Sequence, residues 1–169
     1  MGSAKTMTIE DVMTKSVISV DASITINEAA KMMEDTKVGA VIVMENNSPV
    51  GIVTDRDFAI KVVAQACPVT LPIKQIMSSP LFSINLDESV RTAADLMYGR
   101  KIMKLPVIDG ENVVGIITAR DIVSLLAVCT EDDVRDMYFH SVVKIFANYS
   151  PYNWEKYQIL AITSNRRSE

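Results

Sequence analysis

Hydrophobic and polar residues along this chain follow an order typical of alternating strands and helices. Two short segments, 17–20 and 38–44, are rich in β-branched residues, which predicts extended strands. Between them, apolar residues recur at the spacing of one helical face: Ile26, Ala29, Ala30 and Met33. Asn46-Asn47 indicates a tight turn before a further strand at 50–54, so these two strands should form a hairpin. A second helix is expected next, with an apolar side formed by Phe58, Val62 and Val63.

The whole order recurs 64 positions further along the chain. Residues 9–60 align with residues 73–124 without a gap, and many pairs are identical, among them Ile9 and Ile73, Met13 and Met77, Met33 and Met97, and Gly51 and Gly115. The second copy has its own helical face at Val90, Ala93, Ala94 and Met97, a turn at Asp109-Gly110, and a final helix with Ile122, Val123, Leu125 and Leu126. The chain is therefore a tandem duplication of a β-α-β-β-α unit.

The size of the unit predicts how the two copies are arranged. A unit of roughly 55 residues with a three-stranded sheet would leave one sheet face in water, so two units are expected to pack together. We predict an α+β fold with repeats at 8–66 and 73–128, related by a pseudo-two-fold axis. Pro68 and Pro72 mark the segment between them, because proline discourages helix continuation.

Beyond the repeats, the pattern predicts a C-terminal helix at 131–150. Thr130 is suited to cap its start, and Ser150-Pro151 to end it. One stripe of this helix is largely apolar: Val134, Met137, Tyr138, Ser141, Val142, Ile145 and Phe146. The tail at 151–169 contains Trp154 and Tyr157 but no clear period, so its order is left open.

The sequences GIVTDRD (51–57) and GIITARD (115–121) end the same strand in the two copies. In one interpretation, the T-x-x-D pattern caps the next helix, which contributes about 1 kcal/mol and needs no ligand. In the other, backbone N–H groups, the Thr118 hydroxyl and the Arg120 guanidinium bind a phosphate, while Asp121 accepts hydrogen bonds from ribose hydroxyls. Arginine and aspartate recur in both copies where a cap would tolerate many residues, which favours a nucleotide.

Two units of this order, each closing on G-h-h-T-x-x-D, resemble a CBS domain pair, also called a Bateman module. The resemblance covers about residues 8–128. It implies a stand-alone, energy-sensing regulatory protein that is not an enzyme. It also implies a regulatory ligand that contains adenosine (AMP, ADP, ATP or S-adenosylmethionine), with no catalytic cofactor, and a disc-shaped homodimer that passes its signal to an unidentified regulated protein.

The resemblance further implies two ligand clefts between the repeats. In the expected main cleft, one repeat supplies Thr118, Arg120 and Asp121, which face Ser16, Val17, Ile18, Val38, Gly39 and Ala40 of the other, and Lys104 reaches across to phosphates. The second cleft would combine Thr54, Arg56 and Asp57 with Pro80, Leu81, Phe82, Ile102 and Met103. Gly39-Ala40 leaves room for a purine where Met103-Lys104 fills the equivalent space, so the cleft closed by Asp121 is the preferred site. Phe82 could still stack a base in the second cleft.

Composition narrows the remaining classes of function. The net charge of −4 makes nucleic acid an unlikely partner. With a single histidine, His140, the chain offers no zinc ligand set and no catalytic triad that does not depend on it. No apolar run is long enough to cross a membrane, and the residues 1–7 lack the apolar stretch of a secretory signal. Cys67 and Cys129 are expected to be buried free thiols, which together predicts a cytoplasmic protein.

A ligand-independent dimerisation or protein-interaction module is the alternative function. In that case the 134–146 stripe and the aromatic tail would form the docking surface. The competing expectation is that the stripe packs on the protein's own core.

Overall fold

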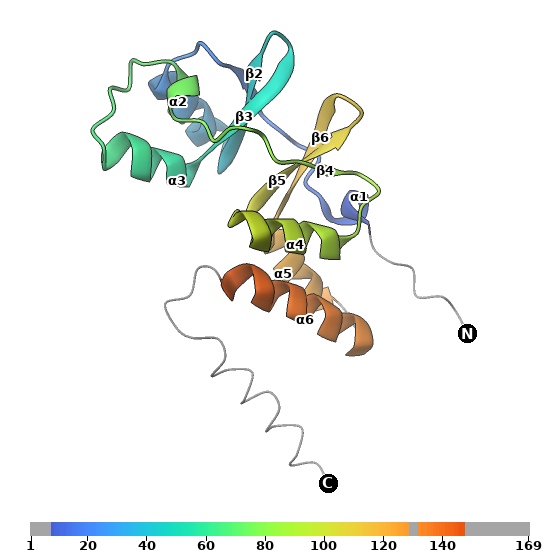
Figure 1. Cartoon of the computed structure of the whole chain (residues 1–169). Helices are drawn as coiled ribbons and strands as arrows, with labels where there is room; N and C mark the ends of the chain where they lie inside the picture. The colour runs from blue at the N-terminus through green and yellow to red at the C-terminus, as the bar shows by residue number, and fades with distance from the viewer. Residues whose placement is uncertain (1–7, 129–131, 148–169) are drawn as a thin grey trace.

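The computed structural model describes residues 8–128 and 132–147, and within them it contains two three-stranded sheets (Figure 1). In each sheet the first strand is parallel to the second, and the second is antiparallel to the third. The strands of the first sheet are β1 Ser19–Asp21, β2 Ala40–Glu45 and β3 Ser48–Thr54. Those of the second are β4 Ile84–Asn85, β5 Lys104–Asp109 and β6 Asn112–Thr118. The predicted α+β fold of two tandem repeats is confirmed.

The first helices of the repeats, α2 Ile26–Thr36 and α4 Val90–Arg100, begin and end in the same way. Thr25 and Ser89 cap their N-termini by accepting a hydrogen bond from the backbone N–H three residues on. Both helices end at a lysine in the left-handed conformation. The predicted apolar faces are buried, except that Ala30 is only half-buried.

Both hairpins are present, with two-residue loops. Asn46 and Asn47 have φ values of 51° and 62°, the double left-handed conformation that suits the twist of a hairpin. In the second repeat the loop is Gly110–Glu111 and not Asp109-Gly110, because Asp109 is paired with Asn112 in the ladder. Gly110 alone has a positive φ there, 60°, so a glycine leads the turn.

The helices that follow β3 and β6 differ between the repeats. After β6 the chain forms a regular helix, α5 Ala119–Val128. After β3 it forms one turn, α3 Asp55–Asp57, and then a π-helix, η1 Phe58–Val63. Two side chains predicted for the apolar faces are exposed instead: Val63 is 78% and Val123 38% exposed.

The segment that precedes the first repeat in sequence packs on the second repeat in space. The short helix α1 Ile9–Val12 lies beside β4 and β6 (Figure 1), and Ile9 is fully buried in the core of the second repeat. Thr14 pairs with Ile116 of β6 through two backbone hydrogen bonds, both 2.9 Å long from N to O.

The segment between the repeats makes the reciprocal exchange. The 3-10 helix η2 Ile73–Gln75 places Ile73 and Ile76 in the core of the first repeat. Ser78 pairs with Ile52 of β3, just as Thr14 pairs with Ile116. The unit that repeats in sequence and the unit that packs in space therefore differ by these two leading segments.

Gly51 and Gly115 are required by this exchange. A Cβ atom on Gly51 would lie 3.0 Å from the Ser78 carbonyl oxygen, and one on Gly115 would lie 3.1 Å from the Thr14 carbonyl oxygen. It would also overlap a methionine side chain in each case. The glycines thus let the incoming backbone approach the strand closely.

The C-terminal helix is α6 Asp132–Ala147, and it packs on α4 and α5 of the second repeat (Figure 1). The part of the predicted stripe whose side chains are described faces this core: Ser141 and Ile145 are buried, and Val142 and Phe146 pack against the cluster. This part of the stripe therefore covers the protein's own core and does not form a free docking surface. The predicted cap at Thr130 and the tail at 151–169 lie outside the described residues, and so do Cys129 and Trp154.

Two further expectations concern single features. None of the helices within residues 8–128 and 132–147 has the length and hydrophobicity to span a bilayer. Cys67 is a free thiol, half-buried rather than buried.

Candidate functional site

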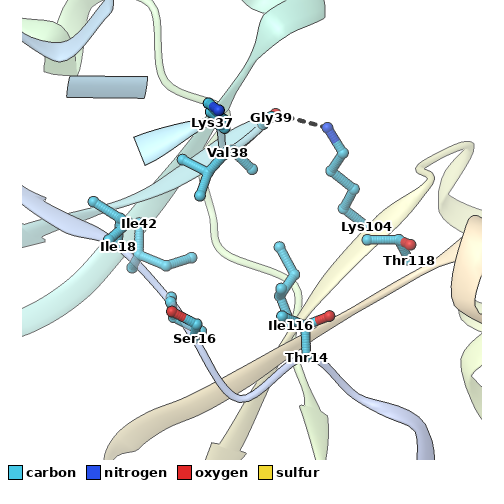
Figure 2. A pocket seen from close by; sticks show the side chains of 12 residues that line it. Thr14, Ser16, Ile18, Lys37, Val38, Gly39, Ile42, Lys104, Ile116 and Thr118 are labelled. Atoms are coloured by element: carbon cyan, nitrogen blue, oxygen red, sulfur yellow. Dashed lines mark hydrogen bonds between the residues drawn. The ribbon is translucent and has the colours of Figure 1, made fainter. Parts of the chain in front are cut away.

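A cavity of about 220 Å³ opens between the two repeats. The first repeat contributes the approach to β1, the loop after α2, and β2. The second contributes β5 and β6, and the exchanged Thr14 completes the wall (Figure 2). The lining residues are Thr14, Ser16, Val17, Ile18, Lys37, Val38, Gly39, Ala40, Ile42, Lys104, Ile116 and Thr118. The volume is below the roughly 300–1,000 Å³ of typical ligand sites, so the cavity is small for a drug-sized molecule.

Eight of the ten residues predicted for the main cleft line this cavity: Ser16, Val17, Ile18, Val38, Gly39, Ala40, Lys104 and Thr118. Arg120 and Asp121 do not line it. Asp121 is half-buried and contacts the wall through the Thr118 hydroxyl, which donates a hydrogen bond of 2.7 Å to its Oδ2. Arg120 is exposed on the first turn of α5.

Four lining residues were not among those predicted: Thr14, Lys37, Ile42 and Ile116. Ile42 and Lys37 flank the predicted strand residues, so the alternation of β2 and the end of α2 could have indicated them. Thr14 and Ile116 form a backbone pair, and they reach the cavity because of the segment exchange. Nothing in the local sequence pattern indicates that pairing.

Lys104 crosses the cavity from one repeat to the other (Figure 2). Its Nζ donates a hydrogen bond of 2.6 Å to the Gly39 carbonyl oxygen and lies 3.2 Å from Asp55 Oδ1. The Lys104 side chain is 24% exposed and the Asp55 side chain 70% exposed. The ion pair with Asp55 is therefore well hydrated and contributes little to stability.

The charged side chains of the cavity wall are cationic, and one of them, Lys104, is paired with Asp55 at the rim. Two of its residues, Lys37 and Lys104, are cationic, and no aspartate or glutamate is among the twelve. Six others are aliphatic and provide apolar surface: Val17, Ile18, Val38, Ala40, Ile42 and Ile116. A ligand with a flat apolar part and a negatively charged group matches both features.

The T-x-x-D pattern at the start of α5 forms a capping arrangement, as one of the two interpretations expected. Asp121 Oδ2 accepts from the Thr118 backbone N–H at 2.7 Å, and the Asp121 N–H donates to the Thr118 hydroxyl at 3.3 Å. This arrangement uses one carboxylate oxygen. Among the described residues, the structure records no partner for the other oxygen, Oδ1. Capping and ligand binding by Asp121 are therefore compatible.

Gly39 lies at the rim of the cavity, under Lys104. A Cβ atom at this position would lie 3.1 Å from Lys104 Nζ and 3.4 Å from Asp55 Oδ2. The glycine thus lets the Lys104 ammonium approach the backbone. Its equivalent in the second repeat is Met103, which packs against the core of that repeat.

The equivalent aspartate of the first repeat, Asp57, has a different environment. Asp57 Oδ2 accepts from the Thr54 N–H at 2.8 Å and the Thr54 hydroxyl at 2.7 Å, and Oδ1 lies 2.8 Å from Lys61 Nζ. Burial alone would raise the pKa of Asp57, but the hydrogen bonds from Lys61 and Thr54 and the charge of Lys61 outweigh it. The pKa is therefore lowered from its usual 3.8.

The other residues predicted for the second cleft also have protein contacts. Phe82 is 37% exposed, and the Arg100 guanidinium carbon lies 4.3 Å from its ring centroid, in a cation–π contact. Ile102 and Met103 pack against the core of the second repeat. Pro80 and Arg56 are exposed and Leu81 is half-buried.

Comparison with known proteins finds the same repeat. The model of the CBS domain matches residues 9–64 and 73–128. The chain is similar to the CBS domain-containing protein YhcV of Bacillus subtilis, with 38% identity over 114 residues, which cover 68% of this chain and 81% of that protein.

Solved structures of other proteins are also similar to this chain. A putative signal-transduction protein with CBS domains from Burkholderia ambifaria matches with a TM-score of 0.68 and 25% identity, and the match covers 74% of this chain and 97% of the other. The CBS domain pair of protein MJ0100, solved in complex with 5′-methylthioadenosine and S-adenosyl-L-methionine, has a TM-score of 0.65 and 31% identity. This match covers 72% of this chain and 97% of the MJ0100 domain pair.

Proposed function

The chain belongs to the CBS domain family as a tandem pair, and from this premise we propose that it is a non-enzymatic regulatory module for an adenosine-containing ligand. The ligand binds in the cavity between the repeats. The single observation that carries the proposal is that cavity, because its wall comes from both repeats and contains eight residues of the predicted main cleft. The adenosine derivatives bound by the CBS pair of MJ0100 support the class of ligand.

Each part of the ligand has a suitable group in or beside the cavity. The aliphatic residues form a slot of the kind that takes a flat purine. The Thr118 hydroxyl and the second carboxylate oxygen of Asp121 provide hydrogen-bonding groups for the ribose. Lys37, Lys104 and Arg120, together with the start of α5, provide positive charge for a phosphate.

The charge of the wall favours AMP, ADP or ATP over S-adenosylmethionine. A nucleotide brings one or more negative phosphates to the two lysines, whereas S-adenosylmethionine brings a positively charged sulfonium centre next to them. Because like charges at close range destabilise a complex, the sulfonium ligand should bind more weakly.

Regulation follows from the position of the cavity. A ligand that contacts both repeats shifts their relative arrangement by the difference in its affinity for the two arrangements. Lys104 is the described contact that crosses the cavity, and a phosphate would compete with Gly39 and Asp55 for its ammonium group. The change at this contact is what a regulated protein would detect.

Isothermal titration calorimetry of the purified chain with AMP, ATP, adenosine and S-adenosylmethionine tests the proposal. We expect binding of a phosphate-bearing ligand in the micromolar range, which corresponds to about 8 kcal/mol. The Asp121→Asn substitution retains an oxygen that can accept from Thr118 but removes the charge and the second acceptor. Since a hydrogen bond to a charged group contributes about 1.5–3 kcal/mol, affinity should fall roughly 10- to 150-fold.

Asp57→Asn is the matched control for that variant, because Asp57 occupies the equivalent position in the other repeat. Its effect on affinity should be less than about twofold. If folded protein gives no heat with any of the four compounds, and equilibrium dialysis also detects no binding, the proposal is wrong. It is wrong as well if the two variants lose the same affinity.

A homodimer is proposed on a separate observation. The helices of the second repeat are covered by α6, whereas the equivalent helices of the first repeat, α2 and η1, expose apolar side chains. Met32, Ile60 and Val63 are 37%, 43% and 78% exposed, and the residue equivalent to Met32, Leu96, packs against the core cluster. Exposed apolar patches of this kind mark association surfaces. Light scattering should show a dimer that Ile60→Glu with Val63→Glu converts to a monomer; an unchanged mass would contradict this surface.

A further inference from the structure

Asp57 and Asp121, the equivalent aspartates of the two repeats, differ in the partner of one carboxylate oxygen. In both repeats Oδ2 belongs to the cap: it accepts from Thr54 in one case and from Thr118 in the other, at 2.7–2.8 Å. The difference lies in Oδ1. Asp57 Oδ1 lies 2.8 Å from Lys61 Nζ and accepts a longer hydrogen bond of 3.4 Å from the Ser78 hydroxyl. The structure records no comparable partner for Asp121 Oδ1 within the described residues.

The difference can be traced to one residue. A shift of 64 positions takes Lys61 to Leu125, which is 6% exposed in the core of the second repeat. The same shift relates Ser78 to Thr14, so a hydroxyl-bearing residue precedes the strand in both repeats. A cation therefore stands next to the aspartate in the first repeat, and an aliphatic side chain occupies the equivalent position in the second.

Lys61 is held by several groups at once. Besides Asp57, its Nζ donates to the Ile76 carbonyl oxygen at 2.7 Å, and it lies 3.4 Å from the Met77 carbonyl oxygen and from the Ser78 hydroxyl. An ammonium group has three N–H donors, and these acceptors account for them. The Asp57 side chain is 12% exposed and that of Lys61 32%, so the pair is partly shielded from water.

A ribose cannot readily replace this partner. Its hydroxyls are neutral donors, whereas the Lys61 ammonium adds the attraction between two opposite full charges to its hydrogen bond with Asp57. Displacing the ammonium would also leave the Ile76 carbonyl oxygen without this donor. One face of Phe82, the ring that could stack a base in this cleft, is occupied by Arg100. Two of the groups that a nucleotide would need here are thus already bound to other parts of the chain.

We propose that Lys61 is an internal occupant of the second cleft, which restricts the chain to one adenine nucleotide, bound on the Asp121 side. The inference rests on the proposed function, because it assumes that Asp121 and Asp57 stand at equivalent nucleotide sites. It adds that Lys61 is the contact that keeps the Asp57 carboxylate from a nucleotide, although the cap formed by Thr54 and Asp57 is the same as in the second repeat.

The experiment measures the stoichiometry of AMP binding by calorimetry and equilibrium dialysis. The full chain should bind one AMP per polypeptide. Lys61→Leu, which copies the second repeat, should bind two, and Lys61→Met serves as a second variant in case leucine packs poorly. Lys61→Arg is the matched control: it preserves the cation beside Asp57 and should still bind one. Thermal unfolding establishes that each variant is folded.

Aspartate variants identify the added site. The double variant Lys61→Leu, Asp121→Asn should retain one AMP site. Its affinity should be at least tenfold higher than that of any site left in the triple variant, which also carries Asp57→Asn. A stoichiometry of two in the unmodified chain would overturn the inference. So would a stoichiometry of one in the folded Lys61→Leu and Lys61→Met variants.

The two proposals fail in different ways. If the unmodified chain binds no AMP but Lys61→Leu binds one, dependent on Asp57, then the role of Lys61 stands and the assigned main site is wrong. If the unmodified chain binds one AMP and Lys61→Leu also binds one, the function stands and the role of Lys61 is wrong. If neither protein binds AMP, both are refuted.

Discussion

Replacing Lys104 by methionine should weaken the binding of AMP without weakening the binding of adenosine. Methionine keeps an unbranched, flexible stem of similar length and removes the charge. The Gly39 carbonyl oxygen loses its hydrogen bond from Lys104 Nζ, but it keeps a second one, 3.3 Å long, from the Asp55 backbone N–H. The cavity wall should therefore stay intact, and the change isolates the cation.

The expected loss can be estimated from the contacts that Lys104 makes with Gly39 and Asp55. A charge-assisted hydrogen bond to a phosphate contributes about 1.5–3 kcal/mol, or roughly 10- to 150-fold in affinity. The ammonium must first give up its 2.6 Å hydrogen bond to Gly39 and its pairing with Asp55, which is 70% exposed and so weak. The net effect should thus lie near the lower end, about 10- to 30-fold for AMP.

Calorimetric titration of both proteins with AMP and with adenosine measures this difference directly. Lys31→Met, at an exposed position of α2 that is not part of the cavity wall, controls for a general change in net charge. A loss below about twofold for AMP would refute the reasoning. An equal loss for adenosine would refute it too, because Lys104 would then hold the wall in place and not the phosphate.

Three other predictions follow from the fold and from the cap. Ile9→Ala should destabilise the protein by about 2–5 kcal/mol, and hydrogen exchange should show the loss of protection in β4–β6 of the second repeat. Ile73→Ala should instead reduce protection in β1–β3, and the opposite assignment would contradict the exchange of segments. Gly115→Ala should destabilise the fold by about 1–3 kcal/mol and weaken AMP binding, since the new Cβ would lie 3.1 Å from the carbonyl oxygen of Thr14, a cavity residue. Gly99→Ala is the control, because nothing lies within 4 Å of its new Cβ, and it should not destabilise the fold. Because the pKa of Asp57 is lowered from 3.8 in the folded state, its charged form stabilises the protein above pH 3.8, and this contribution is lost as pH falls through the folded pKa. In urea unfolding, Asp57→Asn should therefore be less stable than the unmodified protein at neutral pH and should lack this part of the acid dependence. An unchanged profile of stability against pH would refute the assignment.

The repeats and most of the elements could be predicted from the sequence because they depend on local periodicity. The apolar faces of α2 and α4 follow the helical spacing, and both hairpins follow from turn residues with left-handed conformations. The exchange of leading segments could not be predicted in this way. Ile9 and Ile73 stand in the same apolar pattern, with Val12-Met13 and Ile76-Met77 at the same spacing, and the two cores are built from equivalent positions. The local pattern therefore does not decide which core each isoleucine joins.

The candidate site was predictable to a similar degree. Residues near the T-x-x-D pattern and on β2 line the cavity, whereas Thr14 and Ile116 arrive there through the exchange. The difference between Lys61 and Leu125 can be seen one position beyond the aligned copies, as a charged residue opposite an apolar one. Its meaning needed the structure, because the sequence does not indicate that the lysine returns to the aspartate four residues before it.

The reciprocal packing of α1 and η2 has a consequence for how the chain can be divided. A fragment cut at the ends of a sequence repeat carries the helix that belongs to its neighbour and lacks the one that fills its own interior. Residues from β1 to Ser78 form a closed body, while the second half is complete only when the first residues of the polypeptide are supplied from elsewhere. Two separate copies of one repeat would have to exchange these segments across a dimer interface. In the tandem chain the same exchange takes place within one polypeptide.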